Sequence, residues 1–108
     1  MARGLSRGEI WMYRFARPDK RRPVLVLSRQ RALEHLRTAI VAPITTTIRG
    51  LPSEVPLGVA EGLKEDCVVN LDHLYTVAQI DLKAFVGTVS PSKLASVCSG
   101  LAIALGCA

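Results

Sequence analysis

The stretch Lys20-Arg21-Arg22-Pro23-Val24-Leu25-Val26-Leu27-Ser28 joins a run of cations directly to a short apolar segment. Its aliphatic half is typical of a buried strand. Proline is tolerated at the first residue of a strand but not in its middle, so we expect a strand from Pro23 to Ser28 with Arg22 at its mouth. A guanidinium held at a rigid strand end is a good phosphate clamp. We therefore expect the rest of the chain to build a small barrel around this strand and to bring one hydroxyl, that of Thr45, to face Arg22.

The segments on either side of this stretch predict more short strands. Residues 9–15 alternate Trp11, Tyr13 and Phe15 with other side chains, which predicts a strand whose aromatic face supplies most of the aromatic mass of the core. That strand and residues 23–28 are expected to form a β-hairpin. Further strand-like segments are residues 38–45, 54–57, 67–71, 74–77 and 84–89, with Pro43 marking a strand end or a bulge.

Two segments predict helices. Residues 29–37 contain mostly good helix formers, and Ser28 is in position to cap them. A C-terminal helix is expected to begin with Ser90 as its cap and Pro91 at its first position, and to end at Gly106. Its apolar residues at helical spacing are Leu94, Val97, Cys98, Leu101 and Leu105. Small side chains on the same helix would allow another surface to approach closely, which makes a homodimer plausible.

The size and composition of the chain narrow its class. With 108 residues and 11.7 kDa, residues 1–108 are expected to form a single domain. Short strands separated by regular turn signals predict a mainly β fold, a small barrel with a short internal helix and a C-terminal α-helix. No apolar run approaches the ~20 residues that span a bilayer, and the N-terminal residues lack the apolar segment of a secretory signal. A cytoplasmic protein without membrane partners is therefore expected.

The positive charge is concentrated in one part of the chain. The whole sequence carries 14 Lys and Arg against 9 Asp and Glu, a net charge of +5. Residues 1–37 hold ten of the cations and three of the acids, and nine of these ten cations are Arg. Because Arg recognises anions in a planar, bidentate way, this distribution favours a polyanion such as nucleic acid over the alternative of surface salt bridges.

The cysteines and histidines do not indicate a metal site. Cys67, Cys98 and Cys107 form an odd set without a Cys-x-x-Cys pair, so we interpret them as free thiols in a reducing compartment. His35 and His73 are far apart and lack ligand spacing. No metal and no cofactor are expected.

Four motifs in order resemble the MazF/PemK family, the toxins of bacterial toxin–antitoxin pairs. They are Arg7-Gly8-Glu9-Ile10-Trp11, the stretch from Arg21 to Ser28, Pro43-Ile44-Thr45 before Gly50-Leu51-Pro52, and residues 70–77 followed by residues 85–89. The resemblance implies an SH3-like barrel of the MazF/CcdB type, a dimer, and a metal-independent endoribonuclease that cuts single-stranded RNA at short sequences. In the family the Arg before Pro and the Thr after Pro-Ile are the catalytic pair, and these positions are Arg22 and Thr45. On spacing alone, Thr46 or Thr47 would also fit.

These residue types suit RNA cleavage. RNA carries its own nucleophile in the 2′-hydroxyl, so the protein must mainly stabilise the charge on the phosphorane. Arg22 and Thr45 can do so as fixed donors. The sequence does not identify the general base that accepts the proton of the 2′-hydroxyl. His73 is interpreted as a substrate contact or a structural residue, and Glu9 as structural. The expected RNA-binding residues lie in three loops and the cationic run: Arg17, Lys20, Arg21, Thr46, Thr47, Arg49 and His73.

The resemblance also implies partners. The substrate would be single-stranded RNA, either mRNA, tRNA or rRNA. An antitoxin would lay an acidic, apolar, disordered tail across the basic groove and fold on binding. Two alternatives stay open at this point: a CcdB-like topoisomerase poison, and a non-catalytic SH3-like module that binds nucleic acid or a peptide.

Overall fold

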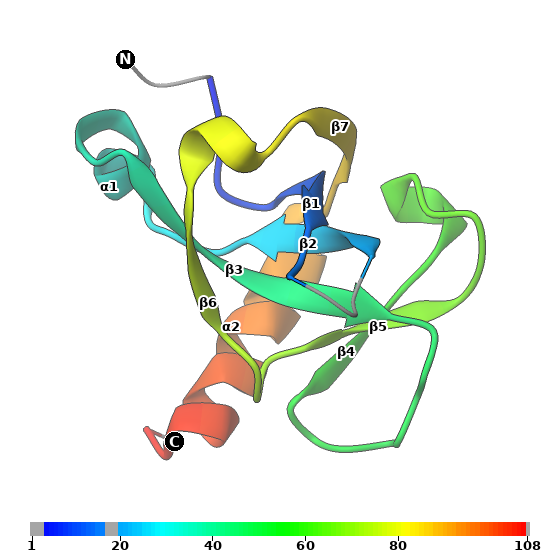
Figure 1. The fold of residues 1–108 in the computed structure, drawn as a ribbon. Coiled ribbons are helices and arrows are strands. Elements are labelled where there is room, and N and C mark those ends of the chain that lie inside the picture. The colour runs from blue at the N-terminus through cyan, green and yellow to red at the C-terminus, as the bar shows by residue number, and fades with distance from the viewer. Residues whose placement is uncertain (1–3, 17–19, 108) are drawn as a thin grey trace.

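The computed structural model describes residues 4–16 and 20–107, and within them the chain forms one curled antiparallel sheet flanked by helices (Figure 1). The strands are β1 (Glu9–Arg14), β2 (Arg21–Val26), β3 (Thr38–Thr45), β4 (Glu54–Leu57), β5 (Cys67–Asn70), β6 (Tyr75–Ala78) and β7 (Ala84–Thr88). The helices are α1 (Gln30–His35) and α2 (Pro91–Leu105), with 3₁₀ turns η1 (Val59–Glu61) and η2 (Gln79–Asp81). The strand order is β4-β5-β3-β2-β1-β7, and β6 pairs with β3. The mainly β fold class and the predicted β1–β2 hairpin are confirmed.

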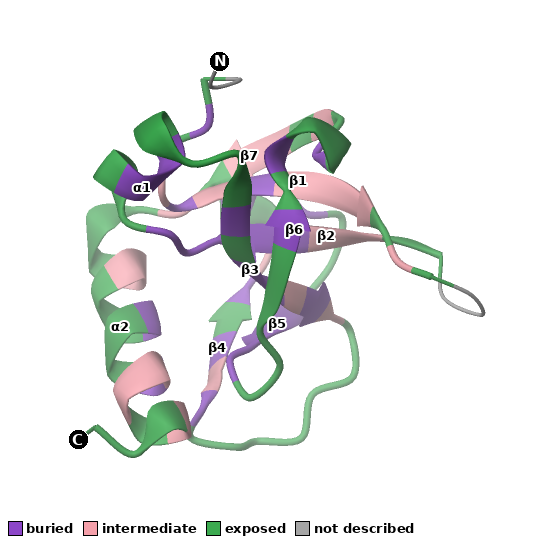
Figure 2. Cartoon of the chain, turned by 60° about the vertical axis from the view of Figure 1, so that its left-hand side comes forward, coloured by how far each residue is buried: buried purple, intermediate pink, exposed green. Residues whose placement is uncertain are grey.

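The second half of strand β2, from Val24, is buried on both faces, as its apolar run predicts (Figure 2). Leu25 and Leu27 pack into the cluster that lies under α2, while Val24 and Val26 pack into a second cluster with α1 and β6. Side chains alternate between the two faces of a strand, so this assignment fixes which way every neighbouring side chain points. The half-buried aromatic side chains of β1 pack against the second cluster, and the expected aromatic face of β1 is confirmed.

The position of Pro23 corrects the predicted strand. We expected Pro23 to begin it, but β2 begins at Arg21, and Pro23 lies inside it opposite Met12 of β1. Pairing of β2 with β3 starts only at Val24. The first half of β2 therefore has an open edge, where a residue without an N–H is tolerated. As a result, Arg22 lies within a paired strand, opposite Tyr13, rather than at its mouth.

Ser28 does not cap α1, which corrects a second prediction. The N-cap residue is Arg29, and no side chain caps the helix. The Ser28 hydroxyl instead accepts a hydrogen bond from the backbone N–H of Ile40 in β3, at 2.7 Å. Helix α1 is held at its other end by Gln79, whose Nε2 lies 2.9 Å from the carbonyl oxygen of Leu36. Tertiary hydrogen bonds thus replace the local cap.

Helix α2 begins and ends as predicted, but its buried face is shifted. Ser90 accepts a hydrogen bond from the Lys93 N–H, Pro91 is the first helical residue, and Gly106 ends the helix in the left-handed region. Val97 and Gly100 are buried, whereas Cys98 and Leu105 are exposed, against our expectation. A Cβ on Gly100 would lie 2.6 Å from Leu71 Cδ1, so this small residue lets α2 pack on its own barrel. It therefore does not serve the approach of a partner.

The two ends of the curled sheet meet where η1 packs against β7. Gly62, which follows η1, has φ +92°, and a Cβ there would lie 2.5 Å from the Val86 carbonyl oxygen. On the facing strand, a Cβ on Gly87 would meet the carbonyl oxygen of Glu61 even more closely. Two glycines facing each other allow the backbones to touch. This contact closes the barrel on the side away from α1.

The three cysteines are free thiols, as predicted, with Cys67 buried and the other two exposed. Among the described residues, no helix is both long enough and apolar enough to cross a membrane.

Cys67 predicts a pH dependence of stability. Burial raises the pKa of its thiol, and the negative charges of Glu65 and Asp66 raise that pKa further. Above about pH 8.5 the unfolded thiol loses its proton while the folded thiol keeps it, so the free energy of unfolding falls as the pH rises through this range. We expect Cys67→Ala to flatten that fall by up to about 1.4 kcal/mol per pH unit. Urea denaturation across the alkaline range would measure it, and equal slopes in both proteins would contradict the assignment.

Candidate functional site

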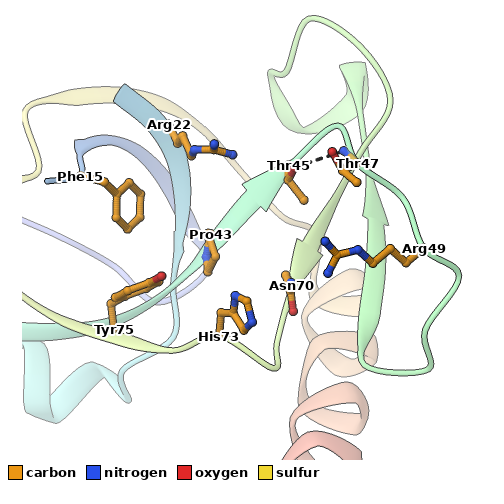
Figure 3. Close-up of a pocket in the computed structure, with 9 residues that line it drawn as sticks. All are labelled: Phe15, Arg22, Pro43, Thr45, Thr47, Arg49, Asn70, His73 and Tyr75. Carbon is orange, nitrogen blue, oxygen red and sulfur yellow. Dashed lines mark hydrogen bonds between the residues drawn. The ribbon is translucent and has the colours of Figure 1, made fainter. Parts of the chain in front are cut away.

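A pocket of about 290 Å³ opens on the face of the sheet that carries Val24 and Val26. Alternation along β2 places Arg22 on that face, and alternation along β3 places Pro43 and Thr45 there too, since Ala42 and Ile44 point into the opposite cluster. Figure 3 shows the Arg22 guanidinium directed toward the side of the pocket where Thr45 lies. The described residues that line it are Phe15, Arg22, Pro43, Thr45, Thr47, Arg49, Asn70, His73 and Tyr75.

The pocket exists because β3 changes its partner at Pro43. The first half of β3 pairs with β6 up to Val41, opposite Tyr75, and its last residues pair with β5 from Ile44, opposite Val69. Pro43 has no N–H to donate between these two ladders. Residues 70–74 lie opposite only residues 42 and 43 and therefore bulge away from β3. Asn70, the last residue of β5, and His73, which lies in this bulge, both line the pocket.

A single carboxylate organises the hydroxyl-rich loop after β3. Glu54 Oε1 accepts hydrogen bonds from the backbone N–H groups of Arg49, Gly50 and Leu51, at 3.1, 2.9 and 3.3 Å. At the start of the loop, the Thr45 hydroxyl accepts a bond from the Thr47 N–H at 3.1 Å. These contacts fix the loop at both ends, so Thr47 and Arg49 are held over the pocket that Thr45 enters.

The charge of the pocket is positive. Among its described lining residues are two arginines and one histidine, and no carboxylate. The two nearby acids are engaged elsewhere, because Glu54 holds the loop and Asp72 accepts a hydrogen bond from the Ser53 hydroxyl. Glu9 accepts bonds from the Ser6 N–H and the Trp11 indole, which confirms its structural interpretation. A cationic pocket without carboxylates favours an anionic ligand.

Two aromatic side chains that we did not predict as site residues form one wall. Phe15 and Tyr75 pack edge to face, with ring centroids 5.1 Å apart, and Tyr13 continues the row at 4.9 Å from Phe15. Tyr75 is 43% exposed, so a ring face remains accessible to a ligand. Phe15 is two residues after Tyr13 and therefore points to the same face of the hairpin, and Tyr13 lies opposite Arg22. This spacing is the sequence signal that could have placed Phe15 beside Arg22.

The structure brings together some of the predicted RNA-binding residues and not others. Thr47, Arg49 and His73 line the pocket with Arg22 and Thr45. Thr46 points to the opposite face of the sheet, into a groove that Cys67 also lines, so alternation separates it from Thr45. Arg21 likewise lines a different hollow, together with Arg14 and Lys83. Lys20 is exposed just before β2, and Arg17 lies outside the described residues.

No cluster of three or more His, Cys, Asp or Glu side chains within residues 4–16 and 20–107 could hold a metal ion. The pocket offers instead a fork of guanidinium donors, a hydroxyl and an aromatic wall. This set defines a class of protein: a small β-barrel with an open cationic pocket, whose side chains are of the types that bind a single strand of nucleic acid.

Comparison with known proteins identifies the family. Residues 6–105 match the family model of the PemK-like, MazF-like toxins of type II toxin–antitoxin systems, and the chain belongs to this family. It is 41% identical over 103 residues to a protein named probable endoribonuclease MazF5 of Mycobacterium tuberculosis, covering 94% of each chain.

Solved structures agree with this assignment. The M. tuberculosis toxin MazF-mt6 superposes with a TM-score of 0.83 at 36% identity, over 91% of this chain and 96% of that one. A mycobacterial endoribonuclease in complex with its cognate antitoxin superposes with a TM-score of 0.85 at 26% identity, over 95% and 96%. The predicted family and the MazF-like barrel are thereby confirmed, and the predicted enzyme class is confirmed at the level of the family.

Proposed function

We propose that this protein is an endoribonuclease toxin that cuts single-stranded RNA without a metal ion. The observation that carries the proposal is that Arg22 and Thr45, from two different strands, share one pocket that no described carboxylate lines. Membership of the toxin family and relatives that are named endoribonucleases support it. Inhibition of translation and growth would follow from cutting mRNA, and the proposed place of action is the cytoplasm, where mRNA is translated.

The proposed reaction uses the nucleophile of the substrate. The 2′-hydroxyl of the ribose attacks the adjacent phosphorus, the bond from phosphorus to the 5′-oxygen breaks, and the products end in a 2′,3′-cyclic phosphate and a 5′-hydroxyl. Arg22 donates to the phosphorane oxygens, and the Thr45 hydroxyl adds a second donor. Arg22 stays protonated, so it can donate a hydrogen bond to the leaving 5′-oxygen but is a poor base. Water takes up the proton of the 2′-hydroxyl and supplies the proton that the 5′-oxygen gains.

The remaining pocket residues would hold the bases. Single-stranded RNA is bound by stacking on aromatic rings and by hydrogen bonds to base edges. Phe15 and Tyr75 offer the stacking surface, while Thr47, Arg49 and Asn70 offer donors and acceptors on the other side of Arg22 (Figure 3). His73 lies between these two walls, where it would contact the substrate. Lys20 and Arg17 would attract the RNA backbone electrostatically.

Two protein partners belong to the proposal. The first is an antitoxin with an acidic, disordered tail that places carboxylates in the positions of the phosphates, since none of the described residues that line the pocket is a carboxylate. The second is another copy of the chain. An apolar hollow between α1, β3, β6 and the end of α2 carries Leu36, Ile40 and Leu105, which are 54%, 43% and 61% exposed. Exposed apolar side chains gathered in this way favour a homodimer.

The alternatives are less well supported. A CcdB-like topoisomerase poison has no need for Arg22 and Thr45 in one pocket, and the matching family model is PemK-like and MazF-like. A plain nucleic-acid-binding module has no need for a hydroxyl beside the phosphate clamp.

A direct test is cleavage of a long single-stranded RNA in excess chelator. We expect discrete cuts with 5′-hydroxyl ends, because neither the nucleophile nor the donors require a metal. The matched control is the same RNA with a single 2′-deoxynucleotide on the 5′ side of a mapped cut, which should block that cut and leave the others. Uncut RNA under these conditions contradicts the proposed activity, and cutting after the deoxynucleotide contradicts the proposed nucleophile. Sequencing of the fragment ends distinguishes the outcomes.

A further inference from the structure

A second cationic site lies beside the β1–β2 hairpin, apart from the Arg22 pocket. Alternation places Phe15 and Arg22 at the pocket and directs Arg14 and Arg21 away from it, into a hollow that Tyr13 also lines. These two arginines are direct partners in the β1–β2 register, and both are exposed. Like charges directly opposite each other on antiparallel strands destabilise the pair. The chain therefore keeps two cations together here at a cost to the hairpin.

A third cation completes the cluster from a different part of the chain. Lys83, immediately before β7, lines the same hollow of about 490 Å³, together with Met12 and Tyr13. Among the described residues that line it, Asp81 is the one carboxylate and offsets one of the three positive charges. Three cations around an open hollow, two of them guanidinium forks, are suited to phosphate groups.

We propose that the hollow lined by Arg14, Arg21 and Lys83 binds phosphates of the RNA substrate that lie beyond the nucleotides in the cleavage pocket. This inference rests on the proposed function. Arg21 and Arg22 are consecutive residues of β2, and one lines the hollow while the other lines the pocket. A single strand leaving the pocket past the hairpin reaches these cations. Contacts to phosphates do not depend on the base sequence, so the hollow should raise the affinity for long RNA without adding sequence specificity.

The alternative occupant is the acidic tail of an antitoxin. Continuity with the cleavage pocket favours RNA, because one flexible strand would occupy both sites in one binding event. The hollow also has few apolar side chains for the apolar residues of such a tail. Binding of an acidic peptide is therefore an outcome of the test rather than part of the proposal.

The test uses the double variant Arg14→Ala/Lys83→Ala and two RNAs that share a mapped cleavage sequence. One RNA is just long enough to fill the pocket, and the other extends well beyond it on both sides. We expect KM for the long RNA to rise about tenfold with kcat unchanged, and the slope of log KM against log salt to fall by about 1.4, as for the loss of two phosphate contacts. Cleavage of the short RNA should not change.

The matched control is Arg31→Ala/Arg37→Ala, which removes the same charge from exposed positions on and just after α1. An equal effect of this control, or an equal effect of the test variant on short and long RNA, overturns the proposal. Unchanged cleavage of long RNA together with lost binding of a poly-glutamate peptide also overturns it and assigns the hollow to an acidic protein segment.

Two further measurements keep this test separate from that of the proposed function. If the wild-type protein cuts no RNA, the cleavage proposal fails, but fluorescence anisotropy of the long labelled RNA still compares the test and control variants. Arg14→Ala should also raise the Tm slightly, because it relieves the like-charge pair with Arg21. If Arg14 binds RNA, the Arg14→Ala variant should bind long RNA more weakly and have a higher Tm. Weaker binding together with a lower Tm would indicate a structural role for Arg14 and overturn the assignment.

Discussion

Replacing Arg22 with alanine is expected to lower the single-turnover rate of RNA cleavage by about 10³-fold, the scale of losing a donor aimed at transition-state charge. Arg22 lies within a paired strand opposite Tyr13, and its guanidinium enters a pocket that no described carboxylate lines. Among the described residues that line the pocket, Arg49 is the one other guanidinium, and it enters from a loop on the other side (Figure 3). Quenched-flow cleavage of a labelled RNA at saturating protein measures the effect.

Two companion variants sharpen this result. Arg22→Lys keeps the charge and loses the planar fork, so its rate should lie between those of the wild type and Arg22→Ala. Arg31→Ala, at an exposed position on α1, should cut at the wild-type rate. If Arg22→Ala changes KM alone and leaves the single-turnover rate intact, Arg22 binds RNA without assisting the chemistry.

The role of Thr45 is tested in combination with Arg22. If both donors act on one phosphate, the effects of Thr45→Val and Arg22→Ala should not add, because residues that act as a unit couple strongly. Fully additive effects would place the two residues on different parts of the substrate. Thr45→Ser keeps a hydroxyl and should retain most of the activity.

The site could be predicted from the sequence only in part. Arg22 stood out because a cation, a proline and an apolar strand follow one another. Which face it points to did not follow from that pattern, because the apolar run from Val24 is buried on both sides and carries no alternation. The face is decided by the hairpin register, which sets Tyr13 opposite Arg22, and by the pairing of Val24 with Pro43. The same information separates Thr45 from Thr46.

The aromatic wall and the helix cap were missed for a common reason. Tyr75 reaches the pocket through the pairing of β6 with β3, a contact between segments that lie far apart in the sequence. Ser28 has the local preference of a cap, but its hydroxyl bonds to Ile40 in β3. In both cases a tertiary contact overrides a local pattern, and local patterns are what a single sequence displays. The two ends of α2, marked by Ser90, Pro91 and Gly106, were predicted correctly because the hydrogen-bond partners of these caps lie a few residues away in the sequence.

The closure of the barrel depends on Gly87, and Gly87→Ala is expected to lower the free energy of unfolding by about 3 kcal/mol, at the upper end for overpacking. A Cβ at this position would collide with the carbonyl oxygen of Glu61, and the facing Gly62 already lies against the Val86 carbonyl. Both obstacles are backbone atoms, so no side chain can turn away to make room. The variant must separate η1 from β7 or distort β7.

The expected Tm decrease is roughly 15 °C, from the usual relation between stability and melting temperature in a domain of this size. The matched control is Gly58→Ala, where a Cβ would meet only the Asp66 Oδ1 atom at 3.3 Å and φ is −168°, in extended backbone that any residue adopts. Thermal and urea unfolding of both variants measure the difference. Because strand β7 pairs with β1, which carries Phe15 at its end, Gly87→Ala should also weaken RNA cleavage well below its own melting temperature. Equal stability of the two variants would show that η1 is free to move away from β7 and that the barrel does not need this closure.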